Sequence, residues 1–192
     1  MKMGSPLSAI ARAVPLFAVA LGACKGGGTD VPSLTPEQVG GVYSVCSLRF
    51  IPEQGALPAA NLLQTVINTA PPAPKQPPSL TLSSTENRYQ LVYTRKSDNF
   101  LQTVQGDVHM YPDQVALDLP NENQSEVTRE LLLPTQLWLG FAENPKHLVT
   151  NTTLVYSVRR SDYARAAGIT ENGLADQISG TLTASFSTGA CP

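Results

Sequence analysis

The chain has 192 residues, the length of one ordinary domain, and only 15% of these residues are charged. The formal net charge is −2, from 13 basic and 15 acidic side chains, which argues against nucleic acid as a partner because phosphate binding needs a basic surface. Three cysteines and two histidines are too few for a disulfide-dense miniprotein or a cysteine-rich zinc site, so we expect no metal and no cofactor.

Residues 1–23 have the pattern of a secretory signal peptide. Lys2 and Arg12 supply a positive start, and no acidic residue precedes Asp30. Residues 13–21, AVPLFAVAL, form a short apolar stretch interrupted by Pro15. A membrane-spanning helix needs about 20 apolar residues to cross ~30 Å of hydrocarbon, so this stretch predicts a signal rather than a stable span.

The cleavage region reads Leu21-Gly22-Ala23-Cys24 and resembles the lipobox of bacterial lipoproteins. In that family a diacylglycerol is attached to the cysteine sulfur and the signal is cut just before it. The resemblance therefore implies that Cys24 is acylated, and two or more acyl chains, such as palmitate, hold a protein durably on a bilayer. The alternatives are an ordinary secretory signal with a chance cysteine and an uncleaved N-terminal anchor.

Residues 24–37 are predicted to be the lipidated cysteine and a flexible tether, because glycines follow at 26–28. The resemblance places the protein in the cell envelope, anchored on the periplasmic side, and Lys25 favours the outer membrane. Removing Lys2 and Arg12 with the signal leaves 11 basic and 15 acidic side chains, a net charge of −4. The expected membrane contact is therefore the lipid rather than a basic surface.

Residues 38–192 are predicted to form one β domain, because apolar and polar residues mostly alternate from Gly40 onward. In the first strand, Val42, Ser44, Cys46, Leu48 and Phe50 are expected to share one face, and Tyr43, Val45, Ser47 and Arg49 the other. Further strands are expected at 80–82, 88–94, 100–110, 114–119, 130–133, 136–141, 148–160 and 178–187, with Gly106 as a bulge or close approach. Short strands with frequent turns favour an antiparallel barrel or sandwich.

Two segments depart from this alternation. Residues 57–69 fit a helix or a strand equally well, and they run into an extended loop from Pro71 to Pro78 that contains five prolines. Residues 161–177 are expected to be helical. Candidate caps are Ser161 or Asp162 at the start, Gly168 at the first end and Thr170 for a second turn through Gln177. A short helical insert, one helix or a pair, is thus expected before the last strand.

Cys46 and Cys191 are the two cysteines that remain once Cys24 is acylated. The compartment beyond the inner membrane is oxidising, so we expect these two to form a disulfide. A bond between the first strand and the chain end would place the first and last strands side by side, which closes an up-and-down sheet into a barrel. The alternative is two free thiols.

The opening Gly41-x-Tyr43, after the lead-in at 34–37, resembles the lipocalin-like families of bacterial lipoproteins. Lipocalins carry Gly-x-Trp in the first strand and a basic residue that packs across the tryptophan. Tyr43 stands where that family has Trp, and Arg159 or Arg160 would be the basic partner. The resemblance implies a mainly β, antiparallel lipocalin-like barrel of about 8–9 strands whose apolar interior takes a small hydrophobic molecule. A helix before the last strand departs from the family's order.

The predicted lining of such a pocket consists of Tyr89, Leu91, Tyr93, Tyr156 and Phe186. The alternative for the tyrosines is a place in the core or at the rim of the barrel. Trp138 faces away from its neighbours Leu137 and Leu139, so it either packs under the helix or is exposed as a partner surface.

The chain contains no nucleophile-elbow motif and no phosphate-binding loop, so we do not expect an enzyme. Asp107 and His109 project from one strand face, but a metal or general-base site would need further groups that we cannot name.

Two functions follow from these features. The first is a lipid-anchored binding module for a small hydrophobic ligand, which predicts room inside the barrel; small residues on the last strand, Gly180 and Ala184, favour it. The alternative is a non-catalytic accessory subunit that docks on a larger membrane protein complex. It predicts a filled core and an exposed apolar patch that includes Trp138 and the loop Pro71–Pro78, and the low charge favours it.

Overall fold

The computed structural model describes residues 33–121, 125–142, 147–150 and 154–191, so the predicted signal, Cys24 and most of the tether lie outside the described residues. Within these ranges, no helix has the length and apolar character needed to cross a membrane. The described elements, in chain order, are α1 (Pro36–Val39), β1 (Gly41–Pro52), β2 (Ala60–Asn61), α2 (Leu62–Thr65), β3 (Ile67–Asn68), β4 (Ser79–Leu82), β5 (Arg88–Arg95), β6 (Leu101–Met110), β7 (Gln114–Asp118), α3 (Glu126–Glu130), β8 (Gln136–Phe141), β9 (His147–Thr150), β10 (Tyr156–Arg159), α4 (Arg160–Ala167) and β11 (Gln177–Ser187).

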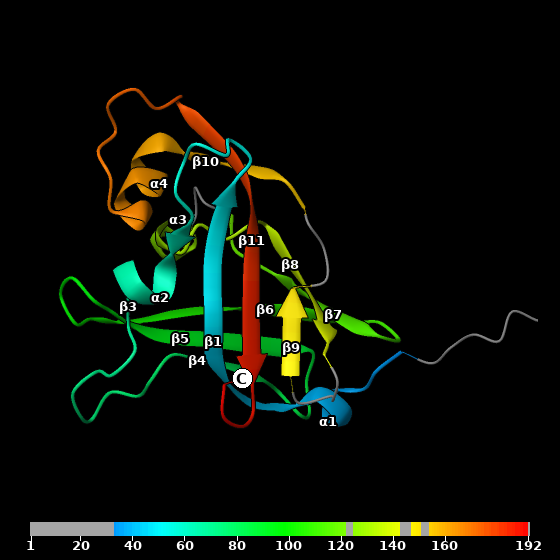
Figure 1. The fold of residues 1–192 in the computed structure, drawn as a ribbon. Helices are drawn as coiled ribbons and strands as arrows, with labels where there is room; N and C mark the ends of the chain where they lie inside the picture. The colour runs from blue at the N-terminus through cyan, green and yellow to red at the C-terminus, as the bar shows by residue number, and fades with distance from the viewer. Residues whose placement is uncertain (1–32, 122–124, 143–146, 151–153, 192) are drawn as a thin grey trace, which may run out of the picture. The chain divides into compact units, whose positions relative to one another are not determined.

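Eight antiparallel strands close into a barrel in the order β1, β4, β5, β6, β7, β8, β9 and β11, and β11 pairs again with β1 (Figure 1). Barrel neighbours follow one another in the sequence, apart from short inserts, so the arrangement is up-and-down. The other described strands are additions: β2 pairs with β1, β3 with β5, and β10 with the first part of β11. The predicted mainly β, lipocalin-like antiparallel barrel, with a short helix before its last strand, is confirmed.

A β-bulge in β1 changes which residues face the interior. The register of β1 against β11 shifts at Cys46, which is an extra residue in the ladder. The buried apolar side chains of β1 are Tyr43, Val45, Leu48 and Phe50. The prediction that Val42 shares a face with Leu48 and Phe50 was wrong, because one inserted residue reverses the phase of a pattern of period two.

Cys46 and Cys191 form the predicted disulfide, and their Cα atoms are 5.3 Å apart. The bond lies at one end of the β1–β11 seam, which runs from the pair Ser44–Ser187 to the pair Pro52–Gly180. The cysteines are 145 residues apart in sequence. Chain-entropy estimates for so long a loop give about 5 kcal/mol of stabilisation, and measured disulfides typically contribute ~2–4 kcal/mol.

Tyr43 is held by the short helix that precedes it. Its hydroxyl donates a hydrogen bond to the carbonyl of Val39 in α1 at 2.6 Å. Arg159 ends β10 beside the start of β11, whereas Tyr43 lies beside the end of β11, a strand of 11 residues. These points are roughly 30 Å apart at ~3.3 Å per residue. The implied packing of Arg159 or Arg160 across Tyr43 was therefore wrong.

Residues 130–133 do not form the predicted strand; they end α3 and the turn after it. Leu133 N–H donates to the carbonyl of Thr128 at 2.9 Å and Leu132 N–H to that of Arg129 at 3.2 Å, the two bonds of a Schellman motif. Leu132 takes the left-handed position of this motif, with φ 49°. The leucines here are buried from all sides, so an apolar run alone did not distinguish a strand from a helix end.

In two other segments, strand pairing decides which secondary structure forms. Residues 57–69, which fitted helix and strand equally, contain both, as β2, α2 and β3. The single strand predicted at 148–160 is two strands, β9 and β10, because they pair with different ends of β11.

The helix before the last strand begins earlier and is shorter than predicted. α4 starts at Arg160 after an N-cap at Arg159, so Ser161 and Asp162 lie inside it. Gly168 ends it as predicted, in the left-handed conformation with φ 68°. The predicted second helical turn from Thr170 to Gln177 was wrong: residues 169–176 form an irregular return with a turn at 171–174, and Gln177 already pairs in β11.

Gly106 is the close approach that the sequence indicated. It pairs with Tyr89 across β5 and β6, and the Tyr89 hydroxyl donates to the carbonyl of Asp118 at 2.9 Å. A Cβ atom at Gly106 would lie 2.4 Å from that carbonyl oxygen and 2.9 Å from the Tyr89 ring. Only glycine leaves space for the ring to cover this strand.

We therefore expect Gly106→Ala to lower the free energy of unfolding by about 1–3 kcal/mol, the usual cost of overpacking. Gly55 is the matched control, because no atom lies within 4 Å of a Cβ built there; Gly55→Ala should change stability by less than about 0.5 kcal/mol. Urea denaturation of the two variants measures the difference, and equal stabilities would contradict this account of Gly106.

Candidate functional site

The interior of the barrel is apolar and almost completely filled. Its cavity has a volume of about 10 Å³, with no polar surface in its lining. This is no more than the space needed for one water molecule. Four of the five predicted pocket residues line the cavity: Tyr89, Leu91, Tyr93 and Phe186. The sequence therefore identified the inward-facing residues, but the room expected between them is absent from the described interior.

Gly180 does not open space inside the barrel. A Cβ atom there would lie 2.5 Å from the ring of Phe50, which occupies the position. Phe50 also packs edge-to-face on Tyr156 and Tyr163, with ring centroids 5.6 Å and 6.0 Å apart. The small residue on the last strand thus accommodates an aromatic cluster, and the inference that it leaves room for a ligand was wrong.

Tyr156 is not among the residues that line the interior cavity. It lies at the start of β10, where its hydroxyl donates to the carbonyl of Leu132. Burial raises the pKa of Tyr156 above its ordinary value. Its predicted role in the interior pocket failed because the strand expected at 148–160 is broken, and β10 is displaced from the barrel wall.

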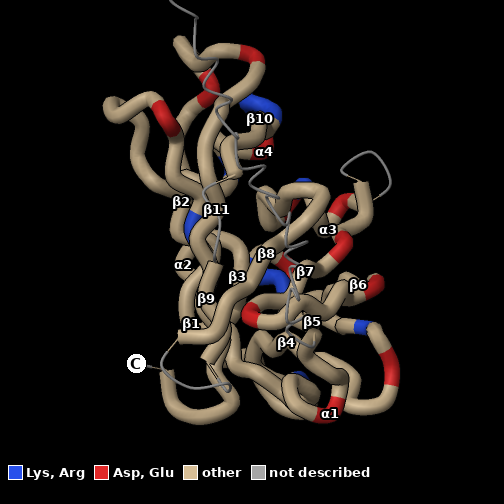
Figure 2. Tube along the Cα trace, turned by 90° about the vertical axis from the view of Figure 1, so that its right-hand side faces the viewer, with Lys and Arg blue, Asp and Glu red and all other residues tan. Residues whose placement is uncertain are grey.

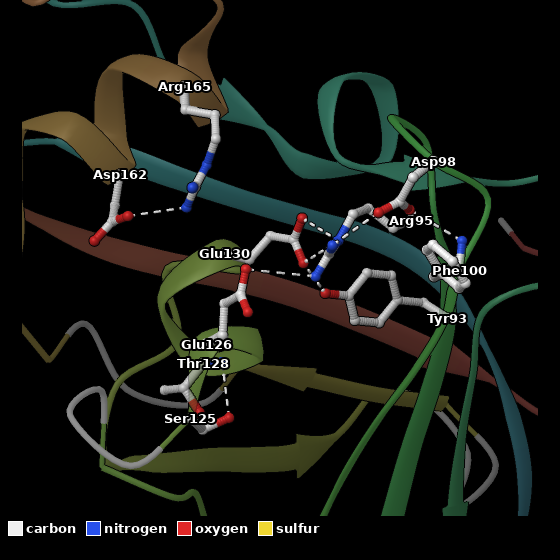
Figure 3. A network of polar contacts seen from close by, with 10 residues as sticks. All are labelled: Tyr93, Arg95, Asp98, Phe100, Ser125, Glu126, Thr128, Glu130, Asp162 and Arg165. Carbon is white, nitrogen blue, oxygen red and sulfur yellow. Dashed lines mark hydrogen bonds and ion pairs between the residues drawn. The ribbon is translucent and has the colours of Figure 1, made fainter.

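A buried polar network lies where Tyr93 leaves the apolar interior (Figure 3). The Tyr93 hydroxyl donates to Glu130 Oε2 at 2.5 Å, and Arg95 Nε lies 2.9 Å from Glu130 Oε1. The Glu130 side chain is only 11% exposed, so its charge depends on these partners. The network joins α3 to β5 and closes this end of the barrel.

Three carboxylates surround Arg95, and they become more exposed from Glu130 to Asp98 to Glu126. Asp98 accepts from Arg95 Nη1 at 2.9 Å, and the more exposed Glu126 lies 3.7 Å from Nη2. Burial and the hydrogen bond to Glu130 raise the pKa of Tyr93, which therefore remains a neutral donor. Figure 3 shows Arg165 of α4 near this network, with its guanidinium turned toward Asp162, with which it pairs at 2.9 Å.

Trp138 lies on the outer face of β8, as its alternation with the buried Leu137 and Leu139 predicted. Its ring packs on Tyr111, with centroids 5.0 Å apart and planes inclined by 36°. The pair is half-buried. Trp138 therefore offers only part of its surface to a partner.

Asp107 and His109 belong to two separate surface pairs. His109 Nε2 lies 2.7 Å from Asp118 Oδ2, and Asp107 lies 3.8 Å from Arg88. Asp118 also accepts from Gln136 at 2.8 Å; this bond and the one from His109 lower the pKa of Asp118. Among the described residues, no three His, Cys, Asp or Glu side chains gather as a metal site would require.

The loop Pro71–Pro78 lies against the tip of the β5–β6 hairpin. Asn68 Nδ2 donates to Asn99 Oδ1 at 3.0 Å, and Lys75 Nζ donates to the Asn99 carbonyl. Beside Asn99, Phe100 is 66% exposed and Leu101 is 53% exposed. We call this set, namely Pro71–Pro78, Phe100 and Leu101, the hairpin surface. In the sequence, Phe100 and Leu101 are adjacent apolar residues and so break the alternation of the strand expected at 100–110. This break is the feature that indicates an apolar side chain outside the barrel.

Comparisons of the chain with protein-family models, curated proteins and solved structures find no match. The residues and their geometry are therefore the basis for a functional proposal.

Glu130→Gln should destabilise the protein, because it keeps the size of the side chain but removes the charge that faces Arg95. Hydrogen bonds to charged groups contribute roughly 1.5–3 kcal/mol, so we expect a loss of about 1–3 kcal/mol in the free energy of unfolding. Glu126 is the control, because it pairs with the same arginine but is 68% exposed. Glu126→Gln should cost less than about 0.5 kcal/mol. Equal losses in urea denaturation would show that burial does not matter here.

Proposed function

We propose that the protein is a lipid-anchored, non-catalytic accessory subunit of the bacterial cell envelope that docks on a larger membrane protein complex. The observation that carries this proposal is the filled interior, whose cavity of about 10 Å³ has no room for a ligand. Pockets for small molecules typically measure about 300–1,000 Å³. A barrel packed in this way serves as a rigid scaffold, and its function is on the outside.

The hairpin surface is the part of the outside best suited to docking. Phe100 and Leu101 leave more than half of their side chains in water, which costs free energy that a partner would recover. Three of the prolines beside them, Pro72, Pro74 and Pro77, are also exposed. Proline loses little conformational entropy on binding, because its ring already restricts the backbone.

The hairpin surface carries one charged side chain, Lys75, among prolines and apolar residues. Basic and acidic positions are scattered among several elements in Figure 2. The centre of a protein–protein interface is depleted of charged residues, and aromatic residues are enriched there. An interface built on Phe100 and neighbouring prolines fits this composition, whereas a highly charged surface would not.

The proposed acyl anchor at Cys24 would keep the hairpin surface close to membrane proteins. Nine residue steps separate Cys24 from Ser33, the first described residue. At ~3.4 Å per residue they span at most about 31 Å. A partner for the barrel is therefore expected at the membrane surface rather than free in the periplasm.

Native electrophoresis of membranes from the source organism, solubilised in mild detergent, tests the proposal. The wild-type chain should migrate with a larger complex, and the double variant Phe100→Ser/Leu101→Ser should migrate alone, because each substitution removes apolar contact area. Val42→Ser is the matched control: Val42 is 62% exposed but lies on β1, outside the hairpin surface, so this variant should stay in the complex.

Solitary migration of the wild-type chain, with its acyl group intact, would contradict the accessory-subunit proposal. If Val42→Ser releases the chain from the complex and the double variant does not, the chain still docks, but through a surface other than the hairpin surface. Trp138→Ala then tests the second outer aromatic surface, which the Tyr111–Trp138 pair forms.

Binding of a small hydrophobic ligand in the interior is the second candidate function. The wholly apolar lining favours it, since four predicted residues meet there. A ligand would have to displace several packed side chains, so we expect no displacement of a fluorescent fatty acid at micromolar protein. Micromolar binding would support the carrier function and contradict a permanently filled barrel.

A further inference from the structure

Residues 125–133, which comprise α3 and the turn after it, fill one end of the barrel without belonging to its wall. We call these residues the plug. Leu131 and Leu133 of the plug are buried, and they line the interior cavity together with strand residues such as Leu91 and Tyr93. In the part of the chain that the structure describes, no plug residue takes part in a strand pairing. Movement of the plug would therefore open the interior and leave the ladders of the barrel intact.

The plug is bonded within itself and is tied to the barrel by side chains. Ser125 Oγ accepts a hydrogen bond from the Thr128 N–H at its start, and the Schellman motif closes its end. Its polar ties to the barrel are the network around Glu130 and the Tyr156 hydroxyl, which donates to the Leu132 carbonyl. The plug can therefore move as one unit when these ties break.

The closed position of the plug is costly. Thr128 Oγ1 and Arg129 Nε are buried, and neither has a hydrogen-bond partner among the described residues. Leu132 has a φ of 49°, in the left-handed region that leucine rarely adopts. Backbone strain and unsatisfied polar atoms persist only where the surrounding structure imposes them, and they gather in segments that switch. These costs fall within residues 128–132, so we expect the plug to open more readily than the strands.

Arg95 connects the plug to the tip of the β5–β6 hairpin (Figure 3). On the plug side, its Nε lies 2.9 Å from Glu130 Oε1, and its Nη2 lies 3.7 Å from Glu126 Oε1. On the hairpin side, its Nη1 lies 2.9 Å from Asp98 Oδ2. One guanidinium group thus holds both segments, and a change in its position affects both.

Asp98 connects Arg95 in turn to the hairpin surface. Its Oδ1 accepts a hydrogen bond from the Phe100 N–H at 3.0 Å. This bond is the main cause that lowers the pKa of Asp98, which therefore keeps its charge. Phe100 is 66% exposed. A continuous series of polar contacts thus runs from an exposed aromatic residue through Asp98 and Arg95 to Glu130 of the plug, as Figure 3 shows.

We propose that the plug is a gate to the barrel interior and that the hairpin tip controls this gate through Arg95. The closed gate, with both plug leucines inside, is the resting state. The open gate exposes an interior lined by apolar side chains alone, so it admits apolar molecules. A partner on the hairpin surface holds Phe100 and Asp98 as they are in the closed state, so docking favours closure. This last step rests on the docking function proposed above.

Thiol labelling of the purified, acylated full chain in detergent micelles measures the opening. Leu131→Cys places a thiol in the plug and Leu91→Cys places one in β5; both positions are buried and line the same cavity. A small maleimide should modify Leu131→Cys about ten-fold faster than Leu91→Cys or more, because the plug opens without the wall. Urea below the unfolding midpoint should accelerate mainly the β5 thiol, since opening of the plug exposes less surface than unfolding.

Substitutions around Arg95, each made in the Leu131→Cys chain, test how the gate is controlled. Glu130→Gln should raise the labelling rate by about ten-fold, because charged hydrogen bonds are lost. Asp98→Asn should raise it by about three-fold, because the partner at the hairpin tip loses its charge. Asp107→Asn is the matched control, since Asp107 is an exposed carboxylate that pairs with a different arginine at 3.8 Å; its rate should stay within about 1.5-fold.

Equal labelling of the two thiols, with the same dependence on urea, would overturn the gate, because the plug and the wall would then open together. An unchanged rate in Glu130→Gln would overturn it as well. A rate in Asp98→Asn no higher than in Asp107→Asn would overturn control from the hairpin tip. Leu133→Cys is the second reporter if Leu131→Cys does not fold. These measurements use the isolated chain, so solitary migration in native gels would remove the docking step and leave the gate standing.

Discussion

The antiparallel pairing of β1 with β11 is the interaction on which the rest of the structure depends. These strands are the first and last of the barrel, and their ladder extends from Ser44–Ser187 to Pro52–Gly180. Without it, the sheet would be open, with two long edges able to pair with other chains. The disulfide from Cys46 secures one end of this seam, and Gly180 admits the Phe50 ring at the other. A closed, strongly constrained barrel follows.

Closure of the barrel also decides where polar side chains and accessible apolar side chains can lie. Inward-facing side chains of an eight-stranded barrel can fill the interior, and here they do, leaving about 10 Å³. The buried charge of Glu130 lies at the end of the barrel, where Tyr93 and Arg95 can satisfy it. Polar and exposed apolar groups are therefore found at the end and on the outer face, which is why the proposed docking surface lies there.

The proposed docking surface lies where the regular ladder stops. The hairpin surface lies at the tip of β5 and β6, where the ladder ends with the pair Thr94–Leu101. At such points side chains are no longer covered by a neighbouring strand, so apolar groups such as Phe100 and Leu154 remain accessible. Function carried by irregular segments on a rigid scaffold is common in β proteins.

The sequence by itself determined the antiparallel barrel, its closure through the two cysteines, and four of the five inward-facing residues. These features follow from local alternation of apolar and polar residues and from the positions of the cysteines, both of which can be read along the chain. Only the tertiary structure decided the bulge at Cys46, the helical end at 130–133, the position of Tyr156 and the filled interior. Each depends on contacts between residues far apart in sequence, such as Phe50 with Gly180 and Tyr156 with Leu132, and no local pattern records whether such contacts leave space or fill it.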